Sequence, residues 1–202
     1  MMLYFWKFLY WLMMRVGIYF QWSRFYRYLN RDHEYIDTKV VRRFSPTEVR
    51  KAIRTLKWVK DGPTELWDAI ADPRYGEWMY QTKLETGEQP EGAFDCDDFA
   101  TWAAASLESD EWETCILNLV WTVKGSIGIE GHNVALVRNR HSGVYWHIGN
   151  WGSFGPFANT KAVVYSMWLI RDGAEGRPRP DKIVGFSTFD HNTLKLRKII
   201  DG

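Results

Sequence analysis

The sequence predicts an α+β domain in which helices come first and an antiparallel sheet follows. Helix signals fill the chain between residues 45 and 107, whereas short runs rich in β-branched and aromatic residues follow Glu113. Glycine, asparagine, aspartate and proline separate these runs, as they commonly do between antiparallel strands. Helices followed by strands are typical of the α+β class.

Each predicted helix has a start or stop signal. Ser45 is an N-cap, Pro46 suits the first helical position and Glu48 completes a capping box, and this helix ends at Asp61-Gly62-Pro63. The other helices are predicted at 64–71, 75–85 and 97–107. Five runs after Glu113 have the composition of strands. These predicted strands are 115–123, 133–138, 144–148, 163–170 and 183–189.

Composition excludes several classes of protein. The chain has 202 residues, of which 46% are apolar and 25% charged, so it is neither disordered nor fibrous. Its net charge of +1 gives no reason to expect a nucleic acid partner. Cys96 and Cys115 are its only cysteines, too few for a disulfide framework.

The aromatic residues predict a separate N-terminal unit, residues 1–44, ahead of a main domain, residues 45–202. The chain has 12 Trp, 10 Tyr and 11 Phe, and twelve of these lie in residues 1–28. Residues 1–31 contain five basic residues and no acidic one. They are Lys7, Arg15, Arg24, Arg27 and Arg31.

Two interpretations of this aromatic segment carry equal weight. At 100° per residue, Lys7, Arg15 and Gln21 fall within an arc of about 120°, so an amphipathic helix at a membrane surface is one of them. The other is a helix packed on its own domain or on a protein partner. A membrane-spanning helix is disfavoured by Arg15 near its middle, which costs about 2.5–3.5 kcal/mol. A secretory signal peptide is also disfavoured, because the segment has neither the basic start nor the small-residue cleavage site of such a signal. We therefore expect residues 1–30 to contact a protein partner or a membrane surface.

The segment 94–100 (FDCDDFA) contains the most informative residue, Cys96. Asp95 can cap a helix with Asp98 as its capping-box partner, which places Cys96 in the first helical turn. A helix N-terminus favours the thiolate, the form of cysteine that acts as a nucleophile. A small buried apolar side chain is an equally good interpretation of this cysteine taken alone.

A histidine and an asparagine on neighbouring strands favour the catalytic interpretation. His132 begins one predicted strand, and the next strand ends near Asn150. An antiparallel hairpin brings these two positions side by side, so that Asn150 can orient the imidazole and His132 can activate Cys96. His147 competes for this role, but it and Asn150 point to opposite faces of a regular strand. Trp151 either shields such a triad or packs in the core.

These residues resemble the transglutaminase-like superfamily, which has a papain-like core, and most of all the bacterial transglutaminase-like cysteine proteinases. The resemblance covers residues 75–152 and includes the segment 80–86 (YQTKLET), with Lys83 where proline is usual. It implies Cys96 as the nucleophile and His132 as the base. The family usually has aspartate as the third residue, and we place Asn150 there, as in papain-like enzymes.

Some members of this family bind calcium through acidic residues that flank the cysteine. Asp95, Asp97 and Asp98 match those positions, and carboxylate oxygens suit calcium. A solvated helix cap explains the same three residues, and no cofactor is required by the proposed chemistry.

We expect a cysteine hydrolase or acyl transferase that acts on peptide or glutamine amide bonds. The alternative is a catalytically inactive member of the same fold, a structural or scaffold protein that docks through its N-terminal helix. Small phage proteins carry such domains, so a cytoplasmic or virion-associated location is favoured over secretion. Elsewhere, Cys115 and Trp102 are predicted in the core, and His33, His141 and His191 in solvent.

Overall fold

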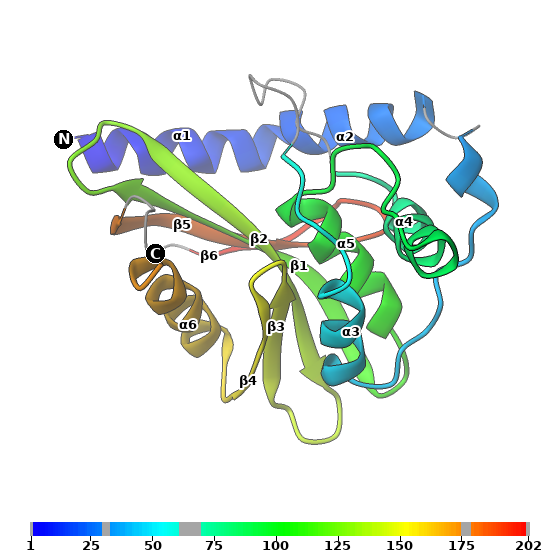
Figure 1. Cartoon of the computed structure of the whole chain (residues 1–202). Coiled ribbons are helices and arrows are strands. Elements are labelled where there is room, and N and C mark those ends of the chain that lie inside the picture. The colour runs from blue at the N-terminus through cyan, green and yellow to red at the C-terminus, as the bar shows by residue number, and fades with distance from the viewer. Residues whose placement is uncertain (1, 30–32, 61–69, 175–178, 201–202) are drawn as a thin grey trace.

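The computed structural model describes residues 2–29, 33–60, 70–174 and 179–200, and its helices cover both faces of one antiparallel sheet (Figure 1). The helices are α1 (Met2–Val16), α2 (Ile18–Leu29), α3 (Pro46–Ile53), α4 (Pro73–Thr86), α5 (Cys96–Leu107) and α6 (Thr160–Asp172), with a 3-10 helix η1 (Glu34–Asp37). The strands are β1 (Trp112–Val123), β2 (Ile129–Asn139), β3 (Tyr145–Gly149), β4 (Gly152–Phe157), β5 (Pro180–Phe189) and β6 (Leu196–Ile200). The predicted α+β class, with helices ahead of an antiparallel sheet, is confirmed.

The sheet has six strands in the order β4-β3-β2-β1-β5-β6, and each neighbouring pair is antiparallel. The two long central strands, β1 and β2, pair along almost their whole length, from Trp112 opposite Asn139 to Thr122 opposite Ile129. They therefore fix which residues of the sheet face each helical layer.

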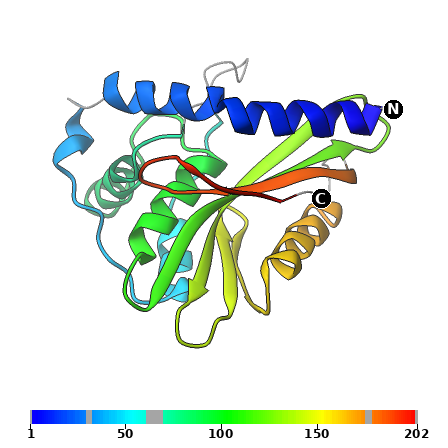
Figure 2. The same ribbon diagram turned by 180° about the vertical axis from the view of Figure 1, so that it is seen from behind.

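Alternation along β1 separates the two faces of the sheet. Ile116 and Val120 belong to a cluster with α1 and α5, whereas Leu117, Leu119 and Trp121 pack with α6. On the first face α5 also packs against α3 and α4. The view from behind shows α6 apart from the other helices (Figure 2).

The aromatic N-terminal segment forms two helices that run along one side of the molecule (Figure 1). Gly17, with φ +66°, separates them, because its left-handed backbone ends α1. Tyr10 and Met14 pack α1 against the sheet, and the Tyr10 hydroxyl lies 2.8 Å from the Ser187 hydroxyl, to which it donates. The division at residue 44 stays a prediction.

Arg27 joins α2 to two distant segments of the chain. Its guanidinium donates hydrogen bonds of 2.7–3.2 Å to four backbone carbonyls. They belong to Ile70, Ala71, His191 and Asn192. Burial lowers the pKa of Arg27, and the nearby carboxylates of Asp72, Asp98 and Asp97 act in the opposite direction. The carbonyls accept hydrogen bonds from the buried Arg27 guanidinium and the carboxylates offset its positive charge, which together reduce the cost of burying it.

Two of the predicted helices are confirmed and one is shorter than predicted. α4 and α5 match the predictions at 75–85 and 97–107. α3 begins at the predicted N-cap but ends at Ile53, because Val59 pairs with Phe94 in an isolated β-bridge that requires extended backbone. The predicted helix at 64–71 falls largely on residues 61–69, which lie outside the described residues.

The predicted strand at 163–170 is wrong, since these residues lie in α6. Asn159 caps this helix by accepting a hydrogen bond from the Ala162 amide, and Val163, Val164 and Met167 form its buried stripe. That spacing fits 3.6 residues per turn, although the composition is typical of a strand. β4 and β6 were not predicted, whereas β1, β2, β3 and β5 match predicted runs.

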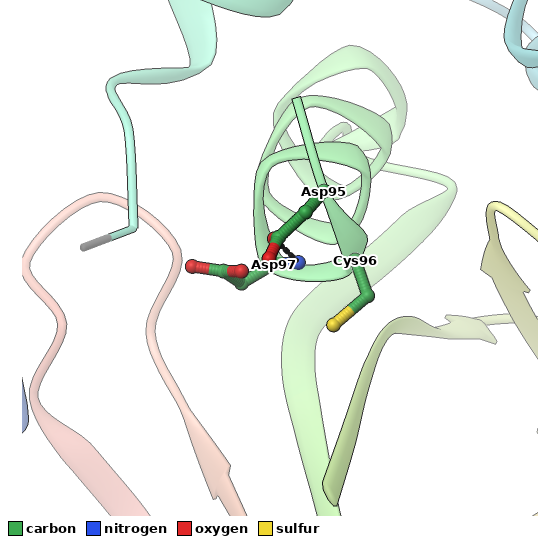
Figure 3. A group of neighbouring side chains, drawn as sticks. All are labelled: Asp95, Cys96 and Asp97. Carbon is green, nitrogen blue, oxygen red and sulfur yellow. Dashed lines mark hydrogen bonds between the residues drawn. The ribbon is translucent and has the colours of Figure 1, made fainter. Parts of the chain in front are cut away.

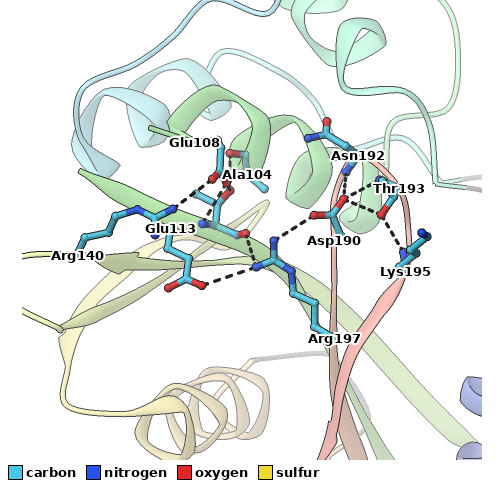
Figure 4. A network of polar contacts seen from close by, with 10 residues as sticks. Ala104, Glu108, Glu113, Arg140, Asp190, Asn192, Thr193, Lys195 and Arg197 are labelled. Carbon is cyan, nitrogen blue, oxygen red and sulfur yellow. Dashed lines mark hydrogen bonds and ion pairs between the residues drawn. The ribbon is translucent and has the colours of Figure 1, made fainter. Parts of the chain in front are cut away.

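A polar network holds the turn between β5 and β6 against the start of β1 (Figure 4). Arg197 donates to the carboxylate of Asp190 at 3.1 Å and to the Thr114 carbonyl at 3.3 Å, and it lies 3.9 Å from Glu113. Burial acts to raise the pKa of Asp190, but hydrogen bonds from Thr193 and Arg197 outweigh it and lower that pKa to about 2. The turn is thus fixed beside α5.

Candidate functional site

Cys96 is the first residue of α5, as predicted. The Asp95 carboxylate accepts a hydrogen bond from the Asp97 amide, and the Asp98 carboxylate accepts one from the Asp95 amide, so the capping box is complete. Cys96 therefore lies in the first turn, at the positive end of the helix dipole, and its side chain is partly exposed. A partly exposed thiol at a helix N-terminus is accessible to reagents, and the helix dipole favours its thiolate form, whereas the nearby carboxylates of Asp95 and Asp97 disfavour it.

Asp95, Cys96 and Asp97 group their oxygen and sulfur atoms within 4.8 Å of one another (Figure 3). Asp98, the third residue predicted to bind calcium, uses both of its oxygens elsewhere: they accept from the amides of Ala71 and Asp95. Calcium takes six to eight oxygen ligands, and a sulfur suits softer ions. Two carboxylates and a thiol do not make such a site by themselves, and the calcium site stays a prediction.

Cys115 provides a contrasting environment for a thiol. It packs against the cluster of apolar residues beneath α6, and burial raises its pKa to about 12. Cys115 thus packs at the edge of a core cluster and is itself only partly buried, so its predicted place inside the core is not reached. The two cysteines differ enough in environment to be distinguished by their reactivity.

His132 lies on the face of the sheet that α6 covers, the face opposite to α5. It pairs with Leu119 in the sheet, and its ring stacks on Trp151 with centroids 3.7 Å apart. The next residue, Asn133, faces the other way, toward the α5 side, where it accepts a hydrogen bond from Asn118 at 2.9 Å. The imidazole of His132 and the sulfur of Cys96 therefore lie on opposite faces of the sheet.

The imidazole of His132 is buried and neutral. Only 5% of the residue is exposed. Burial lowers the pKa of His132 to about 3, and His147 and Arg171 act in the same direction. In this arrangement the ring carries a single N–H proton at neutral pH and no positive charge.

Asn150 lies in the turn between β3 and β4, next to Trp151. Both residues line a groove of about 240 Å³ on the α3 and α5 side, together with Phe99, which lies one turn beyond Cys96 on α5. The other lining residues are Ile53, Arg54, Leu56, Trp58 and Gly152. Trp151 thus touches both the groove and His132.

Two of the three predicted catalytic residues have a buried polar atom without a partner. Among the described residues, neither Nε2 of His132 nor Oδ1 of Asn150 makes a hydrogen bond. Such atoms are uncommon in proteins, because burial without a hydrogen bond costs free energy. Asn150 and Trp151 are neighbours in the chain, and Trp151 covers the His132 ring. The two orphaned atoms therefore belong to one small region.

His147 is held in the structure by other contacts. Its Nε2 lies 3.2 Å from the hydroxyl of Ser166 on α6, and its ring stacks on Phe154 and Phe157. Burial lowers its pKa to about 4. His147 thus has the contacts of a residue that packs α6 against the sheet.

Sequence reasoning missed other buried or cavity-lining groups. His191 was predicted in solvent, but only 2% of it is exposed, because the β5–β6 turn folds against α5 and Arg27 binds its carbonyl. A second cavity, of about 400 Å³, lies beside Asp98 and has aromatic walls, which include Tyr26, Tyr75 and Trp78. Only the tertiary fold brings these scattered aromatic residues together.

The fold and this region define an α+β protein with a cysteine at the first position of a helix and a buried histidine stacked on a partly buried tryptophan. No known protein family matches the chain, and no curated protein matches it either.

Proposed function

We propose that the protein is a cysteine-dependent hydrolase or acyl transferase with a transglutaminase-like, papain-like core. Cys96 is the nucleophile, His132 the base and Asn150 the residue that orients the imidazole. The observation that carries the proposal is the pair of orphaned atoms, His132 Nε2 and Asn150 Oδ1. An imidazole N–H bonded to an amide oxygen is the contact that would satisfy Asn150 in a triad.

The proposed reaction proceeds by acyl transfer. His132 takes the proton of the Cys96 thiol, and the sulfur attacks the carbonyl carbon of a peptide or glutamine amide to form a C–S bond. The C–N bond then breaks, the departing amine takes the proton from the imidazolium, and a thioester remains. Water releases this acyl group as a carboxylic acid, or a second amine takes it as a new amide. Backbone N–H groups at the start of α5 are the candidate donors to the oxyanion.

The proposal requires a different arrangement around His132 from the one described. The ring lies on the α6 face under Trp151, whereas Cys96 starts a helix on the other face. This separation is the main observation against the proposed pair, and the experiments below decide between the two functions.

One observation favours a second candidate function, a catalytically inactive structural or scaffold protein. The separation of His132 and Cys96 by the sheet, together with the low pKa of His132, is what a protein without the reaction would show. Such a protein would dock through its N-terminal helices.

The pH dependence of Cys96 alkylation distinguishes these two functions. In a Cys115→Ser background, Cys96 is the only thiol. We expect iodoacetamide to alkylate it with an apparent pKa at least one unit below the ordinary value of about 8.5. His132→Gln should shift this pKa upward, whereas the exposed control His141→Gln should not. Identical profiles in the parent and His132→Gln would exclude the proposed pair.

Activity then tests the reaction itself. Labelled casein reports hydrolysis, and incorporation of a fluorescent primary amine into casein reports acyl transfer. Either activity should disappear in Cys96→Ala and persist in Cys115→Ser. Absence of both activities, together with unaltered Cys96 alkylation in His132→Gln, would establish the structural alternative.

A further inference from the structure

α1 exposes an apolar surface along its outer side, which we call the outer face of α1. Tyr4 is 77% exposed, Phe5 57% and Phe8 61%, and Trp11 and Leu12 continue the surface at 43% and 39%. At 100° per residue these five side chains fall on one side of the helix. A contiguous exposed apolar surface of this kind is typical of a site that binds a protein, a membrane or a ligand.

The outer face is fixed in orientation, because the opposite side of α1 is packed on the sheet. Tyr10 and Met14 are buried there, and Leu3 and Trp6 pack beside them. The Tyr10 hydroxyl also bonds to Ser187, on β5. The exposed aromatic residues therefore belong to a docked helix, whose own packing surface is already in use.

The charge on α1 is positive. Its two charged residues are Lys7 and Arg15, and it contains no acidic residue. Arg15 lies on the same side of the helix as Phe8, and its guanidinium is 5.5 Å from the centre of the Trp11 ring. This pairing keeps a cation at the level of the aromatic rings, as at the boundary between lipid headgroups and acyl chains.

We propose that the outer face of α1 binds the surface of an anionic phospholipid bilayer. α1 lies parallel to the membrane, with its aromatic side chains among the headgroups and its basic side chains against lipid phosphates. No helix in the described part of the chain is long and apolar enough to cross a membrane. This binding is independent of the chemistry of Cys96.

Charge also favours a lipid surface over a second copy of the chain. A twofold contact between two outer faces would set basic residues against basic residues, because such an interface uses the same patch on both subunits. Residues 1–31 supply no carboxylate to pair with them. Anionic lipid supplies the missing negative charge.

Vesicle sedimentation with the full chain tests the proposal. We expect at least tenfold stronger partitioning to vesicles of phosphatidylcholine with 30% phosphatidylglycerol than to pure phosphatidylcholine, and weaker partitioning at high salt. Phe5→Ser combined with Phe8→Ser, and separately Arg15→Glu, should each reduce it at least tenfold. The control Tyr165→Ser with Leu169→Ser removes two exposed apolar residues from α6 and should leave it unchanged.

Three results would overturn the proposal. One is equal partitioning of the parent and the outer-face variants, each shown to be folded by circular dichroism. Another is a monomeric chain that binds neither vesicle. The third is the absence of vesicle binding together with a dimer, seen in sedimentation equilibrium, that Phe5→Ser with Phe8→Ser dissociates. That result would make the outer face a contact between copies.

Discussion

The imidazole of His132 lies face to face with the indole of Trp151, with ring centroids 3.7 Å apart and 13° between the planes. Trp151 covers the ring at the end of the β3–β4 hairpin, where no strand shields it. Trp151, which lies in the turn next to the predicted catalytic Asn150, is thus one of the residues that bury His132.

Replacing Trp151 by Ala should raise the pKa of His132. Burial holds that pKa at about 3, so water that enters in place of the indole restores the charged form and moves the pKa toward its ordinary value of about 6.5. We expect an increase of at least one unit in a titration of the ring proton by NMR. His147, which is covered by other rings, has a pKa of about 4 that should change less than that of His132. An unaltered His132 pKa would show that Trp151 does not control it.

Because both histidines are buried, we expect the free energy of unfolding to fall in mild acid. Their folded pKa values, about 3 for His132 and about 4 for His147, lie below the unfolded value of about 6.5. The unfolded chain therefore takes up protons first, and stability falls as the pH drops below about 6.5. Each histidine contributes a slope of up to about 1.4 kcal/mol per pH unit.

Urea unfolding at pH 7, 6 and 5 measures this slope. His132→Gln should remove part of it, because one titrating group is lost. His141→Gln, at an exposed turn, should keep the slope of the parent chain. A free energy of unfolding that is constant between pH 7 and pH 5 would contradict the prediction.

The local signals in the sequence predicted α5 and its cap, because these depend on neighbouring residues. Asp95 and Asp98 are three positions apart, and their reciprocal hydrogen bonds need no distant partner. The hairpin of β2 and β3 was predictable for the same reason. The helix at 160–172 was not, since Val163 and Val164 favour strands by composition and only their burial against the sheet selects the helix.

Whether Cys96 and His132 lie on the same face of the sheet could not be predicted from composition. The hairpin argument places His132 beside the Asn150 region but does not say which face its side chain occupies. In the structure the pairing with Leu119 decides this, and a one-residue difference would reverse it. The helix, strand or turn that carries each candidate residue was thus predictable, but the face of the sheet to which its side chain points was not.

A buried ion pair between Arg43 and Glu77 should contribute strongly to stability. Glu77 is 1% exposed and Arg43 8%, their closest atoms are 2.9 Å apart, and Glu77 also accepts from the indole N–H of Trp102. Glu77→Ala leaves the buried Arg43 guanidinium without its counter-charge and the Trp102 indole N–H without its acceptor. We expect a loss of about 3–5 kcal/mol in the free energy of unfolding measured with urea.

The matched control for this pair is on the surface. Arg138 and Glu113 are 3.6 Å apart and about 40% exposed, so Glu113→Ala should cost no more than about 1 kcal/mol. Equal losses in the two variants would show that burial does not set the strength of the Arg43–Glu77 pair.

Gly185 on β5 should be essential for the docking of α1. A Cβ at this position would lie 2.6 Å from two carbons of the Tyr10 ring, closer than van der Waals contact allows. Gly185→Ala therefore forces Tyr10 away from Ser187, and we expect a loss of about 1–3 kcal/mol in urea unfolding. Tyr10→Ala removes the ring and costs stability of its own. In the double variant the clash is absent, so the combined loss should be smaller than the sum of the two single losses. Additive losses would show that Tyr10 and Gly185 do not contact each other in solution, and that α1 packs elsewhere.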